Sequence, residues 1–113
     1  MNYKVIKKHS SSPDPLVLRK GEEVRVGREF TEDPDWPDWV ECTNRAGNTG
    51  WVPKQFLDLS GENAVTLRDY DATELNVEVG ENITVLEFTN GWACARTKNG
   101  EYGWVPLRNL KIE

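Results

Sequence analysis

The sequence predicts an all-β protein built from two tandem domains of one duplicated unit. The pattern Gly-x-x-Gly-Trp-Val-Pro occurs twice in 113 residues, as GNTGWVP at 47–53 and GEYGWVP at 100–106. Between and around these copies, apolar residues alternate with polar ones, which is the pattern of a half-buried strand. Gly, Pro, Asn and Asp separate the short alternating runs, and this punctuation is typical of a compact all-β barrel or sandwich.

The repeat extends well beyond the heptapeptide and divides the chain. At the same offset of 53, Trp39 matches Trp92 and Arg45 matches Lys98. Upstream the match resumes at an offset of 59, so the first copy carries six extra residues, within 27–38. A repeat of this length can close a small core of its own. We therefore expect one domain at 2–59, with a long acidic loop insertion at 27–38, and a second at 64–113, joined by a short linker at 59–64.

Strands are expected wherever apolar residues alternate, and turns wherever Gly or Asn interrupts them. The clearest runs are LVL at 16–18, VRV at 24–26, LNVEV at 75–79 and ITV at 83–85. Asn99-Gly100 is a strong signal for a tight hairpin turn, and Ala46-Gly47 takes the same place in the first copy. Gly50 and Gly103 then enter the next strand, where a missing side chain lets another group pack closely.

Each domain is expected to bury its own apolar residues. In the first core we place Val5, Leu16, Leu18, Val24, Val26, Cys42, Val52 and Leu57. In the second we place Leu67, Leu75, Val77, Ile83, Val85, Ala95, Val105 and Leu110. Cys42 alternates with an outward Glu41 and should be buried, whereas Cys94 occupies an outward repeat position.

Composition excludes several classes of function. The chain is 37% hydrophobic and 29% charged, as in soluble globular proteins, and no run approaches the ~20 apolar residues of a membrane span. The first residues lack the apolar region of a secretory signal, so a cytoplasmic location is expected. A net charge of −5 weighs against nucleic acid and membrane ligands, which are bound through clustered Lys and Arg, and favours basic partners.

Catalysis, metals and cofactors find no support in the residue pattern. Cys42 and Cys94 belong to different domains and are expected to be free thiols. The one histidine, His9, is expected in a surface loop without a catalytic or metal partner. Neither a nucleophile with a matching base nor a phosphate-binding loop is apparent. We expect a protein that is not an enzyme and needs no cofactor.

Each half of the chain resembles a Src-homology-3 (SH3) domain over nearly its full length, of the variant or bacterial type. The second copy, TLRDYDATELNVEVGENITVLEFTNGWACARTKNGEYGWVPLRNLKIE, follows the family's order of motifs. These are an A-L-Y-D-Y-like opening, E-L-x-φ-x-x-G-E, a Trp that opens a strand, and G-x-φ-P. The first copy has VIKKHSSSPDPLVLRKGEEVRV, DWVECTN and GNTGWVPKQFLDL at the same stations. The resemblance implies two tandem, small, five-stranded SH3-like barrels that bind extended or proline-rich peptides.

The resemblance also implies which residues line the two peptide grooves. Polyproline helices dock on flat aromatic rings because proline rings are apolar and already ordered. The candidate peptide-binding residues are Trp36, Trp39, Trp51, Pro53 and Phe56 in the first domain, and Tyr70, Trp92, Trp104 and Pro106 in the second. Several positions depart from the family pattern, because its tyrosines are replaced by Lys7, His9, Arg68 and Asn109.

Strand alternation supports the groove assignment independently of the resemblance. Trp51 is followed by Val52 and Trp104 by Val105, and a strand sends only one of two neighbours inward. If the valines fill the cores, the tryptophans face outward, although core positions for the tryptophans are the alternative. The acids of the first domain's loops either select a basic residue beside the peptide or form a solvated loop.

Three functions remain open on the sequence alone. The first is a tandem adaptor module whose main site is the first domain's groove, binding a neutral or basic extended peptide. The second is a structural or scaffold pair with degenerate grooves. The third is a cell-wall-binding pair cut from a longer exported protein. The favoured expectation is a monomer with a protein or peptide partner, proline-rich or basic.

Overall fold

The computed structural model describes residues 2–113 and divides the chain into two compact units. One unit is Asp14–Ala72, here called the first barrel. The other combines the N-terminal segment up to Pro13 with Thr73–Glu113, here called the second barrel. Both are all-β, as predicted, with one five-stranded sheet each. The only helices among the described residues are two single 3₁₀ turns, so no helix there is long and apolar enough to cross a membrane.

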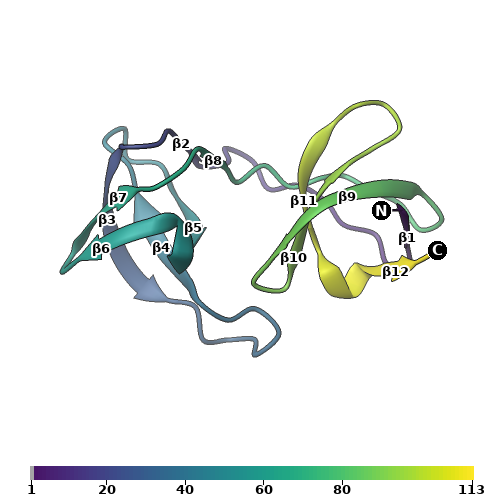
Figure 1. Cartoon of the computed structure of the whole chain (residues 1–113), viewed down its shortest axis with the longest axis horizontal. Helices are drawn as coiled ribbons and strands as arrows, with labels where there is room; N and C mark the ends of the chain where they lie inside the picture. Colours follow the sequence, from purple (N-terminus) through teal and green to yellow (C-terminus); the bar gives the residue numbers. More distant parts are fainter. Residues whose placement is uncertain (1) are drawn as a thin grey trace. The chain divides into compact units, whose positions relative to one another are not determined.

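The second barrel is a meander completed by the N-terminal strand (Figure 1). Its sheet order is β11-β10-β9-β1-β12, and all its neighbouring strands are antiparallel. The strands are β1 (Asn2–Val5), β9 (Asn82–Thr89), β10 (Trp92–Arg96), β11 (Tyr102–Pro106) and β12 (Leu110–Ile112), with the 3₁₀ turn η2 (Leu107–Asn109) before β12.

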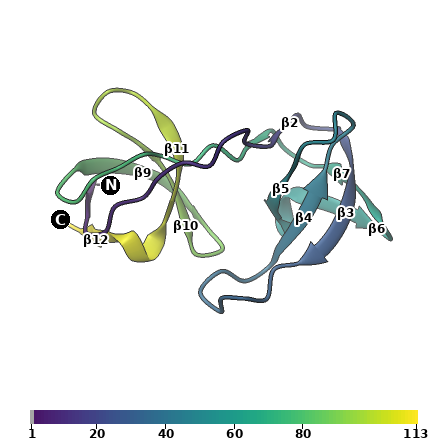
Figure 2. The ribbon, with the colours of Figure 1, turned by 180° about the vertical axis from the view of Figure 1, so that it is seen from behind.

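The first barrel has the same plan (Figure 2). Its sheet order is β5-β4-β3-β7-β6, and a short antiparallel pair, β2 with β8, lies beside it. The elements are β2 (Val17–Leu18), β3 (Glu23–Glu29), β4 (Trp39–Thr43), β5 (Thr49–Pro53), η1 (Lys54–Phe56), β6 (Leu57–Ser60), β7 (Asn63–Thr66) and β8 (Tyr70–Asp71).

The two barrels exchange their first strands. β1 belongs to the first repeat but pairs with β9 and β12 of the second, and β7 belongs to the second repeat but pairs with β3 and β6 of the first. The compact units therefore differ from the contiguous ranges 2–59 and 64–113, because the segment that opens each range lies in the other unit.

The cause of the exchange lies in the segment expected to be a linker. Ser60 pairs with Asn63, which leaves only Gly61 and Glu62 between β6 and β7. Gly61 has a φ of 61°, and glycine at the first central position is what a tight type II′ hairpin turn uses. Because the first and last strands of each barrel are antiparallel neighbours, so short a turn folds β7 back onto β6. The place of the first repeat's own opening strand is then filled.

The exchange also moves core residues. Val5, expected in the first core, joins the second barrel's core, which consists of Tyr3, Val5, Leu75, Val77, Ile83, Val85, Ala93, Ala95, Val105 and Leu110. In the first barrel, buried Ala64 and Thr66 of β7 take the matching places. Two core expectations are wrong: Leu67 is 49% exposed, and Val26 is only partly buried.

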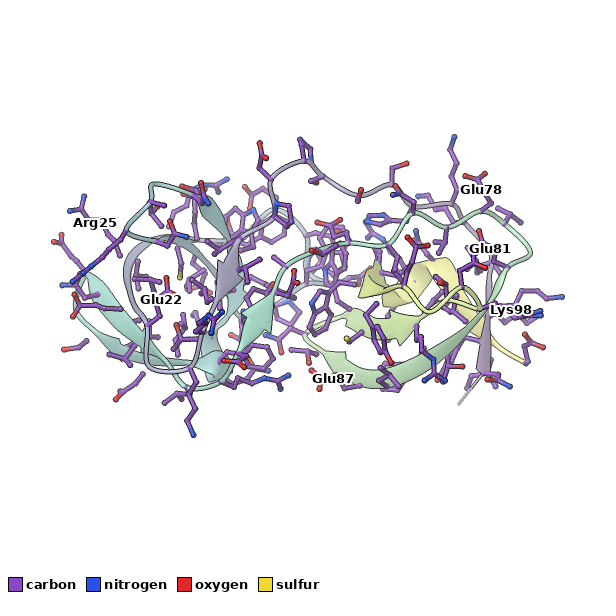
Figure 3. The ribbon with its side chains drawn as sticks, turned by 90° about the horizontal axis from the view of Figure 1, so that it is seen from above. Glu22, Arg25, Glu78, Glu81, Glu87 and Lys98 are labelled. Atoms are coloured by element: carbon purple, nitrogen blue, oxygen red, sulfur yellow. The ribbon has the colours of Figure 1, made fainter. Side chains whose placement is uncertain are left out.

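The shared Gly-Glu step closes an equivalent turn in each barrel (Figure 3). The main-chain N–H of Arg19 donates to the Glu22 carboxylate at 3.1 Å, and the N–H of Glu78 donates to the Glu81 carboxylate at 2.9 Å. Each glutamate thus satisfies a turn N–H that the strands leave without a partner. This local bond accounts for the repetition of Gly-Glu in the sequence.

The repeated Gly-x-x-Gly has two separate physical causes. Gly47 and Gly100 adopt φ values of 88° and 86°, the left-handed conformation that their hairpin turns need. The second glycine allows a close approach instead: a Cβ at Gly50 would lie 2.8 Å from the Leu16 Cβ. At Gly103 it would lie 2.9 Å from the Thr73 carbonyl oxygen. The predicted close packing at both positions is confirmed.

The predicted orientation of the two cysteines is also confirmed. Cys42 is fully buried on β4, Cys94 is half-buried on β10, and neither forms a disulfide. Burial raises the pKa of the Cys42 thiol to about 11, and the neighbouring Glu41 carboxylate adds to the increase.

Engineered cross-links test the strand exchange. Lys4 lies opposite Lys111 in the β1–β12 pair, and Cα atoms of paired residues are roughly 4.5–5.5 Å apart, within disulfide reach. Lys4→Cys with Lys111→Cys should therefore oxidise within one chain. The matched control is Lys4→Cys with Asp58→Cys, since Asp58 holds the equivalent place on β6 opposite Val65. Non-reducing electrophoresis after mild oxidation reads out both. Rapid closure of the control pair instead would show contiguous domains.

Alanine at the second glycine of the motif should destabilise the fold. For Gly103→Ala we expect the free energy of unfolding to fall by about 1–3 kcal/mol, because the neighbouring group is backbone and cannot move aside. Gly27→Ala is the control, since its added Cβ meets nothing closer than 3.4 Å. Urea unfolding of both variants makes the comparison. Equal stability of the two variants would contradict the packing explanation.

The cysteines should differ in reactivity. At pH 8 a thiol with a pKa of about 11 is ionised in roughly one molecule per thousand, so maleimide should label Cys94 much faster than Cys42. The ordinary pKa of 9.0 is restored on unfolding, so the unfolded chain ionises first and stability should decline between about pH 9 and 11. Peptide mapping after timed labelling gives both rates. Equal rates in the folded protein would refute the assignment.

Candidate functional site

The tryptophan, valine and proline of each repeated motif lie on defined faces of a strand pair. In the first barrel Trp39 pairs with Pro53, and Glu41 pairs with Trp51. Directly paired residues share a face, so Trp39, Trp51 and Pro53 lie on one side of the β4–β5 ribbon. Val40 pairs with Val52 on the other side, where the core is.

The second barrel repeats this arrangement. Trp92 pairs with Pro106, and Cys94 pairs with Trp104. Ala93 and Val105 pair on the opposite face and belong to the core, which contains neither tryptophan. The four motif tryptophans therefore lie on the strand face opposite these core residues, but they are not equally accessible. Trp39 and Trp104 are buried, at 7% and 6% exposed, whereas Trp51 and Trp92 are half-buried.

Strand exchange assigns Tyr70 to the first barrel. Its ring meets Phe56 edge-on, with centroids 5.6 Å apart and an interplanar angle of 68°, and its hydroxyl donates to the Trp51 carbonyl at 2.8 Å. Arg68 lies in the same barrel as Tyr70, and the Arg68 guanidinium carbon is 4.2 Å from the Phe56 ring centroid. The sequence placed both residues beside Trp92. The structure corrects this assignment because the strand that precedes them is β7.

A second group of aromatic rings in the first barrel includes one that the sequence analysis missed. Phe30 lies 5.2 Å from Trp51 and 5.9 Å from Trp36, centroid to centroid. Arg28 lies 4.9 Å from the centroid of the Trp51 ring, a cation–π contact. We call Phe30, Trp36 and Trp51 the aromatic row. An aromatic at the start of the acidic insertion was the available signal for Phe30.

The rings of the first barrel differ in accessibility. Trp39 is 7% exposed, and Phe56 and Tyr70 are 5% exposed each. The aromatic row is only half-buried. A ligand that reaches this barrel therefore meets the aromatic row more readily than the three buried rings.

The acidic insertion of the first barrel is partly neutralised by local pairs. Arg28 bonds Glu32 at 2.6 Å, and Lys54 bonds Glu29 at 2.8 Å. The hydrogen bond from Arg28 lowers the pKa of Glu32, and the N–H of Thr31 lowers it further. Even so, residues 14–72 hold 7 Lys and Arg against 13 Asp and Glu, a net charge of −6. The remainder of the chain holds 7 against 6, a net charge of +1.

Polar side chains replace two groove tyrosines in the second barrel. His9 Nε2 lies 2.6 Å from a Glu74 carboxylate oxygen, and the imidazole meets Trp92 edge-on at 5.5 Å. Asn109 is 4% exposed and donates to the Lys8 carbonyl at 3.3 Å. His9 was expected on the surface of a loop but is partly buried, because the exchange brings it against the second repeat.

Metal-ligating side chains do not gather in the described residues. Across 2–113, no group of three or more His, Cys, Asp and Glu side chains is arranged to hold a metal ion.

Comparison with known proteins identifies the family. No solved structure gives a significant match to the chain. The family model described as "Variant SH3 domain" matches twice, at residues 3–59 and 64–113. Domains of this family generally mediate protein–protein interactions and are typically non-enzymatic. The two matches cover nearly all the chain, so this protein belongs to the variant SH3 domain family and carries two copies of the domain.

Proposed function

We propose that the chain is an adaptor whose first barrel binds an extended, proline-rich or otherwise apolar protein segment with a basic flank. The proposal rests on one observation: strand exchange brings the Tyr70 ring into contact with Phe56. It gathers Trp39, Phe56 and Tyr70 in the barrel that also holds the aromatic row.

The contacts in the first barrel suit such a ligand. Proline-rich segments dock between aromatic rings and lose little entropy, since they are already ordered. The half-buried rings of Phe30, Trp36 and Trp51 provide the first contact surface. The barrel's charge of −6 attracts a cationic flank, and electrostatic attraction of this kind mainly increases the association rate. The proposed binding residues are Trp36, Trp39, Trp51, Pro53, Phe56 and Tyr70.

The second barrel is the weaker candidate for the same ligand. Trp92, Trp104 and Pro106 are present, but His9 and Asn109 stand where the family has tyrosines. A proline ring placed against them would bury polar groups without new hydrogen bonds, which costs free energy.

The burial of three rings favours a second candidate function. Trp39, Phe56 and Tyr70 are each at most 7% exposed, so most of their apolar surface is already buried without a ligand. A scaffold domain, which presents a fixed surface to one protein and binds no free peptide, needs no more exposure than this.

Removal of one ring from the aromatic row tests the proposal. We expect Trp36→Ala to weaken binding of an Arg-flanked proline-rich peptide about tenfold or more, because an aromatic anchor typically supplies that much. Trp36 lies outside the strands, so the fold should persist. The matched control is Trp92→Ala in the second barrel. Amide NMR shifts during titration, with and without the Arg, give both location and affinity.

The outcomes separate the two candidate functions. Shifts at residues 28–56 and 68–71 that Trp36→Ala weakens support the adaptor. If shifts map to Trp92 and Trp104, the assignment to the first barrel is wrong. If no peptide perturbs either barrel, the scaffold is the better account.

A further inference from the structure

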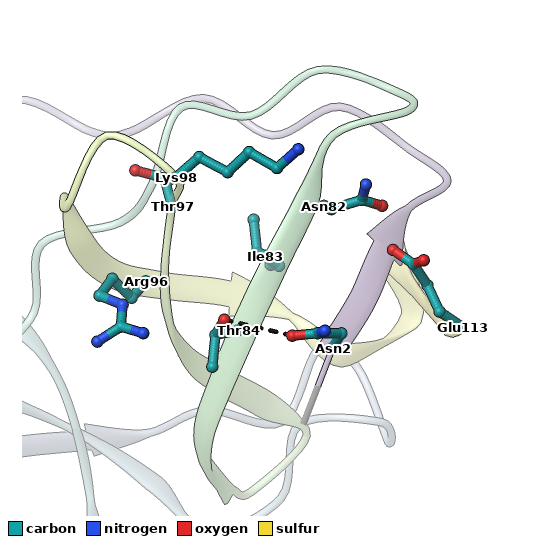
Figure 4. A pocket seen from close by; sticks show the side chains of 8 residues that line it. All are labelled: Asn2, Asn82, Ile83, Thr84, Arg96, Thr97, Lys98 and Glu113. Carbon is teal, nitrogen blue, oxygen red and sulfur yellow. Dashed lines mark hydrogen bonds between the residues drawn. The ribbon is translucent and has the colours of Figure 1, made fainter.

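A polar recess in the second barrel is separate from the aromatic faces (Figure 4). Its volume is about 460 Å³. It is lined by Asn2, Asn82, Ile83, Thr84, Arg96, Thr97, Lys98 and Glu113. Arg96 and Trp92 stand at opposite ends of β10, roughly 13 Å apart at the rise of a strand. A ligand in the recess would thus leave the tryptophan end of the strand unoccupied.

Sheet register builds the floor of the recess. Asn2 pairs with Thr84 across β1 and β9, and Thr84 pairs with Arg96 across β9 and β10. These three side chains therefore lie side by side on one face. The Thr84 hydroxyl donates to the Asn2 side-chain oxygen at 3.4 Å, the contact drawn in Figure 4. Strand exchange supplies Asn2, so the floor needs both repeats.

Two cations in the recess have no acidic partner. Neither Arg96 nor Lys98 forms an ion pair with any other residue of 2–113. Lys98 sits on a closed hairpin, in which Thr97 N–H donates to the Glu101 carbonyl at 2.9 Å and Gly100 N–H donates to the Thr97 carbonyl at 3.0 Å. Figure 4 shows the Lys98 side chain extended toward the start of β9, where Asn82 lies. The backbone that carries Lys98 is thus fixed, while the Arg96 and Lys98 side chains are exposed and not neutralised by an ion pair.

Asn82 adds an unsatisfied acceptor to the same recess. Its side-chain oxygen is buried and accepts no hydrogen bond from residues 2–113. A buried polar atom without a hydrogen-bond partner destabilises the fold, so a donor at this point stabilises the barrel. The recess thus combines two positive charges with a buried acceptor that lacks an N–H or O–H donor.

We propose that this recess binds an acidic peptide segment of a partner protein. Guanidinium groups match carboxylates through paired hydrogen bonds, and a lysine beside one adds a second positive charge. A peptide also brings main-chain N–H groups, one of which reaches the Asn82 oxygen. The volume falls within the roughly 300–1,000 Å³ of ligand pockets and exceeds what one small anion fills. Glu113 on the lining disfavours a further acid next to it.

The charge distribution of the whole chain favours this division of ligands. The first barrel carries −6 and repels an acidic segment, whereas the second carries +1 and concentrates two unpaired cations in one recess. Attraction between exposed charges is screened by salt, so binding here should weaken as ionic strength rises.

The test is a titration of the full ¹⁵N-labelled chain with a blocked peptide, Gly-Glu-Asp-Glu-Gly-Asp-Glu-Gly. We expect shifts at the amides of 82–84 and 96–98 and at the Asn82 side-chain NH₂. Arg96→Gln with Lys98→Gln should weaken binding about tenfold or more, since two charge-assisted contacts are lost. Lys7→Gln with Lys8→Gln removes the same charge from exposed positions of the same barrel outside the recess and should have little effect.

Two further arms make the proposal falsifiable. Asn82→Asp changes one atom and puts a negative charge at the buried acceptor, so acidic peptide binding should be lost while the amide spectrum stays folded. The Gln/Asn version of the peptide should not bind. Equal shifts with the neutral peptide, unchanged affinity in the Arg96/Lys98 variant, or saturation by inorganic phosphate without a response to the peptide would each overturn the proposal.

Discussion

The two-residue turn at Gly61-Glu62 is the constraint on which the rest of this structure depends. It places the last strand of the first repeat and the first strand of the second in one hairpin, Ser60 opposite Asn63. In a barrel whose first and last strands are neighbours, that hairpin fills the opening-strand position with the wrong repeat's strand. The first repeat's own strand, β1, then completes the second barrel. A longer connection would leave both strands free to stay with their own repeats.

The exchange also sorts the side chains that follow each opening strand. Tyr70 and Arg68 follow β7 into the first barrel, where they contact Trp51 and Phe56. His9 follows β1 into the second barrel, where it meets Glu74 and Trp92. The exchange thereby adds the Tyr70 ring to the aromatic residues of the first barrel and a polar pair, His9 and Glu74, to the second. Neither candidate site is the product of one repeat, so separately expressed halves would lack parts of both.

Much of the fold follows from patterns local in sequence, and most of what does not follow depends on the exchange. The tryptophan and valine of each motif face opposite sides, and Cys42 is buried, because alternation along one strand fixes them. Gly50 and Gly103 admit close neighbours for the same local reason. Val5, His9 and Tyr70 were placed in the wrong barrel because no periodicity within a strand reveals which repeat it joins. Which repeat a strand joins depends on the length of the turn at Gly61-Glu62, and the sequence of this turn is equally compatible with a linker.

The exchange changes the net charge of each compact unit. Residues 14–72 are not one repeat, yet they gather a net charge of −6, while the rest of the chain has +1. Contiguous domains would divide the same residues as −1 for 1–60, with 9 Lys and Arg against 10 Asp and Glu, and −4 for 61–113, with 5 against 9. The exchange places Lys4, Lys7 and Lys8 in the second barrel, and Glu62, Asp69 and Asp71, together with Arg68, in the first. These transfers change the two net charges to −6 and +1 and make the first barrel the more acidic one. Because long-range attraction acts on the folded units, the strand exchange itself sets which barrel attracts cationic segments and which admits an acidic one.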